Sequence, residues 1–299
     1  MTNIHFAKLP DRAVLKIGGP EKRDFLQGLI TNDMEKLSAD NAIYAALLTP
    51  QGKIIADFFL AERGDDFLLD CDAQIAPALV KRLTMYKLRA DVTIEALGDE
   101  NVAVLFGAEA ATCAGLTGTA GNTVQNGTAT VFVDPRHAEL GARIIASDVD
   151  AALTSVGAET SDAAPEAYKA HRIGLGVAEG TRELGTENMF ALEANMAELN
   201  GVDFKKGCYV GQEVTARMKH KTTLRKRIVP LSSDSPLPDG EASVSAGDRT
   251  IGDLCATSGT AALALLRLDR LEDAQASGDA PQVGDLAVTP TNPPWLEIV

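Results

Sequence analysis

The sequence has 299 residues, of which 45% are hydrophobic and 23% are charged. These fractions are close to those of ordinary globular proteins and exclude a disordered chain, a collagen and a long coiled coil. The net charge of −14 at pH 7 argues against a surface devoted to nucleic acid.

The first hundred residues predict a mixed α and β unit. A strand is expected over 12–17 and a helix between Pro20 and Ile30. Strands then follow over 43–49, 54–61 and 67–70, with a helix over 75–86 and a strand over 92–96. Because tight turns such as the one over 50–53 separate the neighbouring strands, we expect these strands to pair antiparallel.

The rest of the chain predicts two further units. Strands over 102–106, 128–133 and 143–146 accompany helices over 108–114 and 164–175, and the Gly/Ala/Thr-rich stretch 115–127 is typical of a mobile connector. From about Arg225, short strands broken by Gly, Asp and Pro predict a small β-barrel or sandwich without a helix in its second half. The fold class is therefore α+β, with crude linear units of 1–100, 101–223 and 224–299.

The four cysteines, Cys71, Cys113, Cys208 and Cys255, are far apart in the sequence. No C-x-x-C pair exists for a zinc knuckle or a redox dithiol, so no metal site made by this chain alone is predicted. Neither a stretch of 18 apolar residues nor a signal peptide is visible. We expect a protein of a reducing compartment, without a membrane partner.

One segment, Lys206-Gly207-Cys208-Tyr209-Val210-Gly211-Gln212-Glu213, fits neither a helical nor a strand period. Its two glycines allow positive φ or close backbone approach, so the thiol can be presented on a tight loop. Lys206 and a helix starting near Gln212 would favour the thiolate. The alternative is an inert cysteine buried in the core.

The same region is strongly basic. Between Lys205 and Arg227 eight basic residues face one acid, Glu213, which gives a local charge of +7 in 23 residues and leaves −21 for the remainder. This pattern indicates either a solvated surface or the mouth of a site that attracts anions.

The motif KGCYVGQE, followed by Thr215 and Arg217, resembles the signature loop of the folate-binding iron-sulfur cluster assembly factors. This family is similar to the aminomethyltransferase (T-protein) of the glycine cleavage system. The segments FLQGLITND, TPQGK, DPR, LEANM and NGVDFKKGCYVGQE occur in the family's order and look closest to its mitochondrial-type branch. The resemblance implies a three-domain ring around a tetrahydrofolate pocket, with the first two domains interleaved and a β-barrel at the end.

The resemblance also implies site residues. Cys208, with Lys206 beside it, would be the functional thiol. The folate-binding residues would be Tyr168 as a stacking aromatic, Glu193 as the carboxylate that grips the pterin, and Asn32, Gln27, Arg172, Gln212, Glu213 and Arg217 as polar groups. For Tyr168 the alternative is a core aromatic, for Glu193 a solvated loop acid, and for Asn32 a turn residue.

The sequence departs from the transferases at their catalytic aspartate. Ala76-Pro77 stands where the family's Lys-Asp pair would fall. Asp70 and Asp72 lie nearby but are interpreted as caps of the helix over 75–86. The ancestral transfer reaction is therefore expected to be lost, which leaves enzyme activity uncertain.

The leading hypothesis is a tetrahydrofolate-binding protein that helps to assemble or repair [4Fe-4S] clusters on client enzymes. One thiolate cannot hold a cluster alone, so an A-type scaffold would supply the other ligands of a transient cluster. Two alternatives stay open: a folate-dependent aminomethyltransferase that uses Asp70 or Asp72, and an RNA-binding protein that uses the basic segment 217–227. The expected location is the cytoplasm of a bacterium, or the mitochondrial matrix of a eukaryote.

Overall fold

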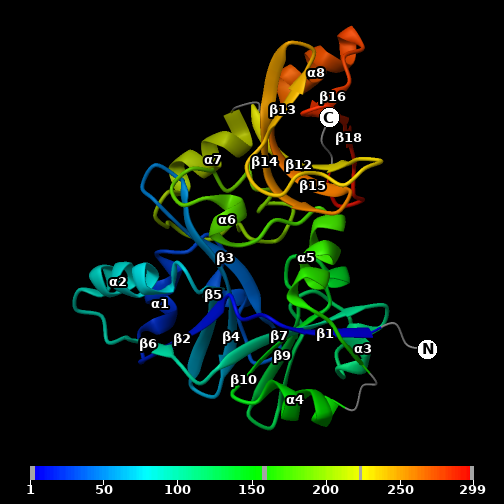
Figure 1. Ribbon diagram of the computed structural model, residues 1–299. Helices are drawn as coiled ribbons and strands as arrows, with labels where there is room; N and C mark the ends of the chain where they lie inside the picture. Colours follow the sequence, from blue (N-terminus) through cyan, green and yellow to red (C-terminus); the bar gives the residue numbers. More distant parts are fainter. Residues whose placement is uncertain (1–3, 157–159, 222–223, 297–299) are drawn as a thin grey trace.

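The computed structural model describes residues 4–156, 160–221 and 224–296. They form three lobes, each built on its own β-sheet (Figure 1). The first sheet has the order β3-β4-β5-β2-β6 and is antiparallel throughout; its strands are β2 (Arg12–Gly18), β3 (Ile43–Leu48), β4 (Ile54–Arg63), β5 (Asp66–Asp72) and β6 (Thr93–Leu97). Beside it lie the short helices α1 (Lys22–Gln27) and η1 (Met34–Lys36) and the longer α2 (Ala76–Lys87).

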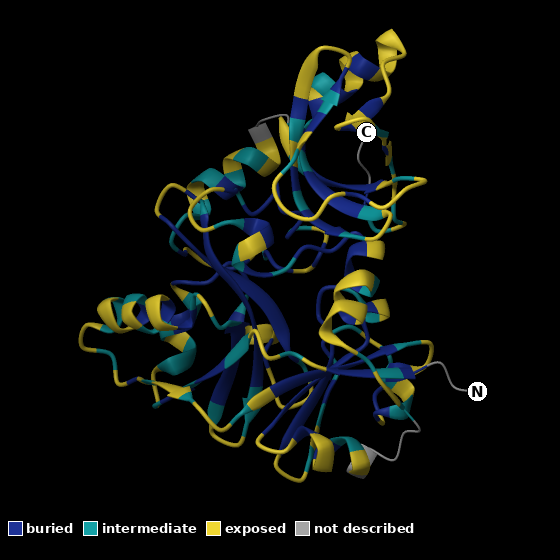
Figure 2. Ribbon diagram, viewed as in Figure 1, coloured by how far each residue is buried: buried dark blue, intermediate teal, exposed yellow. Residues whose placement is uncertain are grey.

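The central strands of this lobe are buried on both faces, as the dark ribbons of Figure 2 show. Along β3, Ile43, Ala45 and Leu47 join the core under α2, because alternate side chains point to opposite faces. Tyr44 and Ala46 point the other way, into the core shared with the other lobes. The first lobe is thus packed between its own helices and the rest of the molecule.

The second lobe begins at the N-terminal strand. β1 (Ile4–Lys8) pairs antiparallel with β7 (Asn101–Gly107), with Ile4 opposite Gly107, so the chain starts in the second lobe, builds the first and then returns. The six-stranded sheet has the order β11-β1-β7-β10-β9-β8; its other strands are β8 (Thr123–Asn126), β9 (Ala129–Val133), β10 (Ala142–Ala146) and β11 (Ser161–Asp162). The accompanying helices are α3 (Ala110–Cys113), η2 (Ala138–Leu140), α4 (Val149–Val156) and α5 (Pro165–Gly174).

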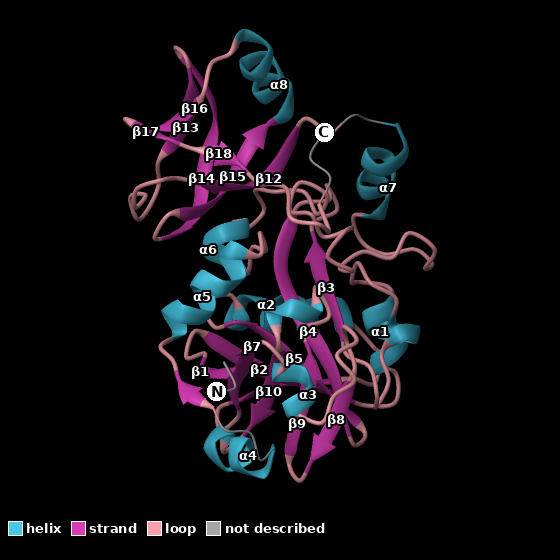
Figure 3. Ribbon diagram, turned by 90° about the vertical axis from the view of Figure 1, so that its right-hand side faces the viewer, coloured by secondary structure: helices cyan, strands magenta, loops and turns pink. Residues whose placement is uncertain are grey.

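The third lobe is a curved antiparallel sheet with the order β17-β16-β13-β14-β15-β12-β18. Its strands are β12 (Lys226–Ser232), β13 (Ser243–Ala246), β14 (Arg249–Ser258), β15 (Ala261–Arg267), β16 (Pro281–Val283), β17 (Leu286–Ala287) and β18 (Thr289–Pro290). Between the second and third lobes the chain forms α6 (Gly180–Leu184) and α7 (Gln212–Lys221), and Figure 3 shows α7 beside the barrel. Trp295 anchors the C-terminal segment, since its Nε1 donates to the carbonyl of Leu175 at 3.0 Å.

Two predictions about these elements were wrong. The stretch 115–127 contains β8, which pairs with β9, because Thr123 and Val124 supply β-branched residues among the glycines. The barrel contains α8 (Leu268–Ser277), where Leu268, Leu271 and Ala274 are buried at helical spacing. The predicted helix over 75–86 and the strands of the first lobe are confirmed within a few residues at each end. No helix of the described residues is long and apolar enough to span a membrane.

Candidate functional site

Cys208 lies in the loop that leads into α7, and it is the exposed one of the four cysteines. Cys71 is buried in β5, and burial raises its pKa to about 12. Burial also raises the pKa of Cys255 to about 12, while Cys113 is partly buried at the end of α3. Cys208 is therefore the thiol that can meet a partner without a change in the fold.

Lys206 fixes this loop to the first lobe. Its buried ammonium donates to the carbonyl oxygens of Gln27 at 2.8 Å, Ile30 at 2.7 Å and Asn32 at 2.7 Å. Burial lowers the pKa of Lys206 to about 8. We predicted that Lys206 activates the thiol, but its three N–H donors all bind carbonyl oxygens of the first lobe. Lys206 holds the loop in place and leaves Cys208 outside.

Asp203 shapes the approach to Cys208. Its Oδ1 accepts from the backbone N–H groups of Lys205 at 2.6 Å and Lys206 at 2.9 Å, a local turn closed by a side chain. Its Oδ2 pairs with Lys36 of η1 at 2.7 Å. These partners outweigh the effect of burial and lower the pKa of Asp203, so the loop is tied to the first lobe by an ionised carboxylate as well as by Lys206.

Gly211 gives close contact between this loop and the predicted turn over 50–53. Its φ is +84°, and a Cβ there would lie 2.7 Å from the carbonyl oxygen of Thr49. Gly52 has a φ of +81°, and its Cβ would lie 3.0 Å from Cβ of Val214 in the first turn of α7. Gly207 differs from the expectation, because no atom lies within 4 Å of its added Cβ and its φ is not in the left-handed region. Of the two glycines that flank Cys208, only Gly211 is required by the backbone.

The same turn reaches the LEANM segment through Lys53. Its Nζ donates to the carbonyl of Asn188 at 2.7 Å and lies 3.5 Å from the ring centroid of Phe190. Glu193 accepts from the N–H of Phe190 at 2.9 Å through Oε2. Burial lowers the pKa of Lys53, which the charge of Glu193 opposes and the nearby Lys226 reinforces. The segments TPQGK, LEANM and KGCYVGQE, distant in the sequence, therefore meet at one place.

Glu193 is a buried acid, only 9% exposed, and not a solvated loop residue. Its backbone carbonyl accepts from the N–H of Ile228 of β12 at 2.8 Å, so it ties the segment after α6 to the barrel. Its second carboxylate oxygen, Oε1, makes no hydrogen bond with the residues that the structure describes. This oxygen is available to a donor from a ligand.

Gln27 and Asn32 already have partners in the protein. The Gln27 amide donates to Asp33 at 2.8 Å and accepts from the N–H of Met34 at 2.8 Å. The buried Asn32 donates to the carbonyls of Tyr44 at 2.7 Å and Asn200 at 2.8 Å and accepts from the N–H of Asp33 at 2.9 Å. Both side chains organise the segment that receives Lys206. They do not offer free polar atoms to folate.

Arg172 and Tyr168, both on α5, are buried. Arg172 forms a two-pronged pair with Glu183 of α6, at 2.7 and 2.5 Å, and so joins two helices. The Tyr168 ring packs edge-on against Phe106 at 5.5 Å between centroids, within a small core cluster. It is not an open stacking platform. Its hydroxyl is buried without a hydrogen-bond partner among the described residues, and burial raises its pKa to about 12.

The remaining predicted residues lie at the start of α7, which confirms that a helix begins at this loop. Gln212 is the first residue of α7. Glu213 and Arg217 pair across one turn at 3.3 Å, with side chains 91% and 58% exposed. This pair is a surface feature one turn from Cys208, and in such exposed positions it contributes little to stability.

A buried network of ion pairs joins the first and second lobes. Asp70 accepts from Arg12 at 2.6 Å and from Arg143 at 2.8 Å. Arg136, the arginine of the DPR segment, pairs with Asp134 at 2.8 Å and with Glu179 at 2.6 Å. Burial alone would raise the pKa of Glu179, but the arginines hold it well below its usual value.

Sequence reasoning found little of this network, and it misassigned Asp70 and Asp72. Asp70 is fully buried in the network and does not cap α2. Asp72 accepts from Gln74 in the turn before α2, but its Oδ2 accepts from the N–H of Thr181 at 2.9 Å and thereby caps α6 of the neighbouring segment. The sequence could have predicted buried ion pairs in this region. Asp57 lies inside the apolar strand Ile54–Arg63, and a buried charge needs a buried partner.

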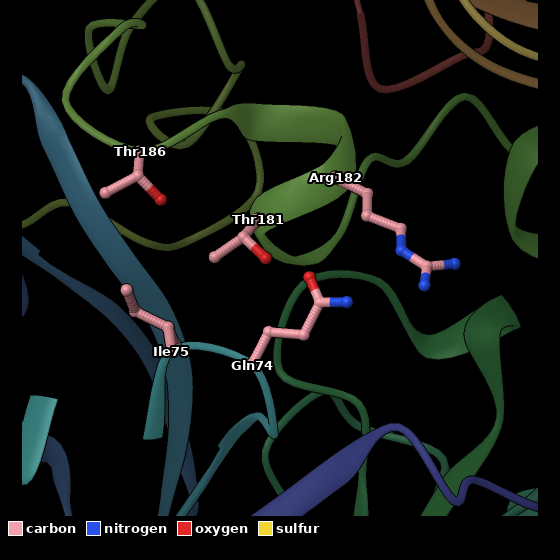
Figure 4. A pocket seen from close by; sticks show the side chains of 5 residues that line it. All are labelled: Gln74, Ile75, Thr181, Arg182 and Thr186. Carbon is pink, nitrogen blue, oxygen red and sulfur yellow. The ribbon is translucent and has the colours of Figure 1, made fainter. Parts of the chain in front are cut away.

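A cavity of about 370 Å³ lies between α2 and α6 (Figure 4). Its lining residues are Gln74, Ile75, Thr181, Arg182 and Thr186. It adjoins Ala76-Pro77, the position where the sequence departs from the transferases. Cys208 does not line it. Over residues 4–156, 160–221 and 224–296, no group of three or more His, Cys, Asp or Glu side chains is arranged to hold a metal ion.

Comparison with known proteins identifies the family. The human iron-sulfur cluster assembly factor IBA57, mitochondrial, is 34% identical over 284 residues, which cover 89% of this chain and 78% of the human protein. The protein of the same name from Mus musculus is 33% identical over 287 residues, with the same coverage. The chain belongs to the IBA57 family. Residues 225–298 also match the C-terminal beta-barrel domain of CAF17, in agreement with the third lobe of this IBA57 relative.

The fold has a counterpart among solved structures. The aminomethyltransferase T of the glycine cleavage system from Bartonella henselae superposes with a TM-score of 0.78. The match covers 99% of this chain and 87% of that protein at 16% sequence identity, so it shows a shared fold alone. The predicted α+β fold with a C-terminal β-barrel is thereby confirmed for this member of the IBA57 family.

Proposed function

We propose that this protein helps to assemble or repair [4Fe-4S] clusters on client enzymes, and that Cys208 is its functional thiol. The observation that carries the proposal is the presentation of Cys208. The loop around it is fixed by buried contacts of Lys206 and Gly211, while the thiol itself is exposed. Membership of the IBA57 family supports the same role.

The cluster is cargo that this chain shares with a partner. Iron-sulfur clusters need about four protein ligands, commonly thiolates. Cys71 and Cys255 lie in strands of different lobes, and burial disfavours their thiolates. One exposed thiol therefore requires other ligands from outside, and we propose that an A-type scaffold protein supplies them before delivery to the client enzyme.

Tetrahydrofolate is a proposed second ligand, and the residues fit it in part. Glu193 retains a free carboxylate oxygen for the N–H donors of a pterin, and Lys53 and Lys226 nearby could attract the carboxylates of a glutamate tail. Tyr168 is left out of this site, because its ring is buried in a core cluster of the second lobe. Gln27, Asn32 and Arg172 are left out of this proposal, because their polar groups are engaged within the protein. Bound folate would supply a carrier of one-carbon units.

The transferase alternative is not favoured by these contacts. Its two candidate acids are both occupied: Asp70 by the guanidiniums of Arg12 and Arg143, and Asp72 by the N-terminus of α6. Both carboxylates are therefore engaged in contacts that hold the lobes and α6 together.

The test of the thiol uses cells that depend on this protein. We would replace the native protein with Cys208→Ala, Cys208→Ser or the control Cys113→Ala at equal expression, and measure a [4Fe-4S] dehydratase beside a [2Fe-2S] ferredoxin. Both Cys208 variants should lower only the [4Fe-4S] activity, while Cys113→Ala should match the wild type. Equal dehydratase activity in all strains would remove Cys208 from the mechanism.

The folate proposal has a separate test, equilibrium titration of the purified protein with tetrahydrofolate. Glu193→Gln keeps the shape of the side chain but removes its charge, and should weaken binding by about tenfold or more, as expected for a charged hydrogen bond. The exposed Glu213→Gln is the matched control and should change little. Unchanged affinity in Glu193→Gln would exclude the proposed pterin contact.

A further inference from the structure

We propose that a basic surface around Cys208, consisting of Lys205, Lys219 and Lys226, is the docking site for an acidic protein that carries the anionic cluster. This inference rests on the proposed function and specifies the kind of partner. All three lysines are exposed. They come from three different elements, the Cys208 loop, α7 and β12.

The structure brings Lys219 to the loop that carries Lys205 and the thiol. The ammonium of Lys219 lies 5.5 Å from the ring centroid of Phe204, the residue that precedes Lys205. His220 also contacts Phe204, at 6.3 Å between centroids, so the C-terminal half of α7 folds back on the loop that carries Cys208. Lys226 follows the end of α7 by five residues, which a fully extended chain spans in about 18 Å.

The turn over 50–53, which touches the first turn of α7, adds a further basic residue. Lys226 is close enough to lower the pKa of Lys53, which the turn over 50–53 carries. That turn contacts the first turn of α7 through Gly52 and Val214. Lys53 and Lys226 thus lie near the start of the helix that follows the Cys208 loop. Within the segment Glu213 is the one acid between Lys205 and Arg227. The acids from elsewhere already have partners in the protein: Asp203 pairs with Lys36, Glu198 with Arg227, and Glu193 lies beside Lys53.

The charge distribution makes this surface distinct from the rest of the protein. The segment from Lys205 to Arg227 carries a formal charge of +7, of which the buried Lys206 and the Arg227 paired with Glu198 add little to the surface, whereas the remaining residues carry −21. An acidic partner is therefore repelled over most of the molecule and attracted where Cys208 is exposed, which orients the encounter. The cargo strengthens the effect, because a cluster held by four thiolates bears a net negative charge.

The experiment measures association with a purified A-type scaffold protein loaded with a [2Fe-2S] cluster. The association rate would be recorded by stopped flow at 50, 150 and 400 mM NaCl. One variant combines Lys205→Glu with Lys219→Glu. The second, Lys226→Glu, leaves the Cys208 loop and α7 unchanged, and so tests the charge if the double variant disturbs the loop. The control, Lys81→Glu with Arg89→Glu, makes the same charge change at exposed positions in and after α2 of the first lobe.

We expect the double variant to slow association by about tenfold or more at 50 mM NaCl, with the difference shrinking as salt screens the charges. Lys226→Glu should show a smaller effect of the same sign, and the control should stay within about twofold of the wild type. Equal slowing by the control would show that only net charge matters and would overturn the proposal. So would rates that do not respond to any of the variants.

Two further arms separate this inference from the function on which it rests. If scaffold association depends on Cys208 but not on the lysines, the docking surface is wrong and the proposed function stands. If the wild type does not associate at all, the proposed partner fails as well. If a single-stranded RNA of 30 nucleotides binds and the lysine variants abolish only that binding, the surface belongs to RNA and the proposal is overturned.

Discussion

The substitution Lys206→Met tests whether a buried ammonium holds the Cys208 loop. Methionine keeps an unbranched side chain of similar length but removes three hydrogen bonds to carbonyl oxygens, at 2.7 to 2.8 Å. Bonds from a charged donor contribute about 1.5–3 kcal/mol each. Burial of the charge offsets part of that sum, as the lowered pKa of about 8 indicates. The expected loss of stability is about 3 kcal/mol.

The assay is urea unfolding followed by circular dichroism, combined with hydrogen exchange of the segments 27–34 and 203–210. Lys205→Met is the matched control, because its side chain is exposed and adjacent in sequence; it should change stability by less than about 0.5 kcal/mol. Faster exchange in both segments of Lys206→Met alone would confirm the tether. Identical midpoints and exchange rates in the two variants would refute it.

The same residue predicts a pH dependence. Between pH 8 and 10.5 the unfolded chain binds a proton on Lys206 that the folded protein has released, so the free energy of unfolding rises with pH in this window. The stability of the wild type relative to Lys206→Met should therefore increase from pH 8 towards pH 10. A constant difference across this range would show that the amine titrates normally.

Three other predictions concern positions outside this tether. Gly211→Ala should lower the free energy of unfolding by about 2–4 kcal/mol, because the φ of Gly211 is +84° and the new Cβ would lie 2.7 Å from the carbonyl oxygen of Thr49. The control Gly207→Ala, measured in the same urea titration, should be nearly neutral. Equal effects of the two substitutions would show that Gly211 has no special backbone role. Arg143→Met removes one of the two arginines that pair with each of the buried acids Asp70 and Asp134. It should lower the free energy of unfolding by about 3 kcal/mol, against a negligible change for the exposed Arg249→Met. A loss below about 1 kcal/mol would exclude a structural role of the network. Trp295→Phe removes one hydrogen bond to the carbonyl at the end of α5. Beyond the loss of buried area, this should lower the free energy of unfolding by about 1 kcal/mol. A thermal midpoint equal to that of the wild type would contradict this prediction.

The sequence by itself determined much of the local structure, including the loop at Cys208. Alternation along the first lobe and the helical spacing of Leu79 and Leu83 placed β3, β4, β5 and α2, because these patterns depend on neighbours close in the chain. The mismatch of KGCYVGQE with either period indicated a loop at Cys208, which the structure shows exposed.

The tertiary structure alone decided the partners of the charged residues. The acceptors of Lys206 lie 174 to 179 residues earlier in the chain, and Arg143 meets Asp70 across 73 residues. No local pattern encodes such pairs, since the side chains are brought together only when β1 pairs with β7 and the lobes interleave. The role of Lys206 changed for this reason: its neighbour in sequence is Cys208, but its partners in space are the carbonyls of the first lobe.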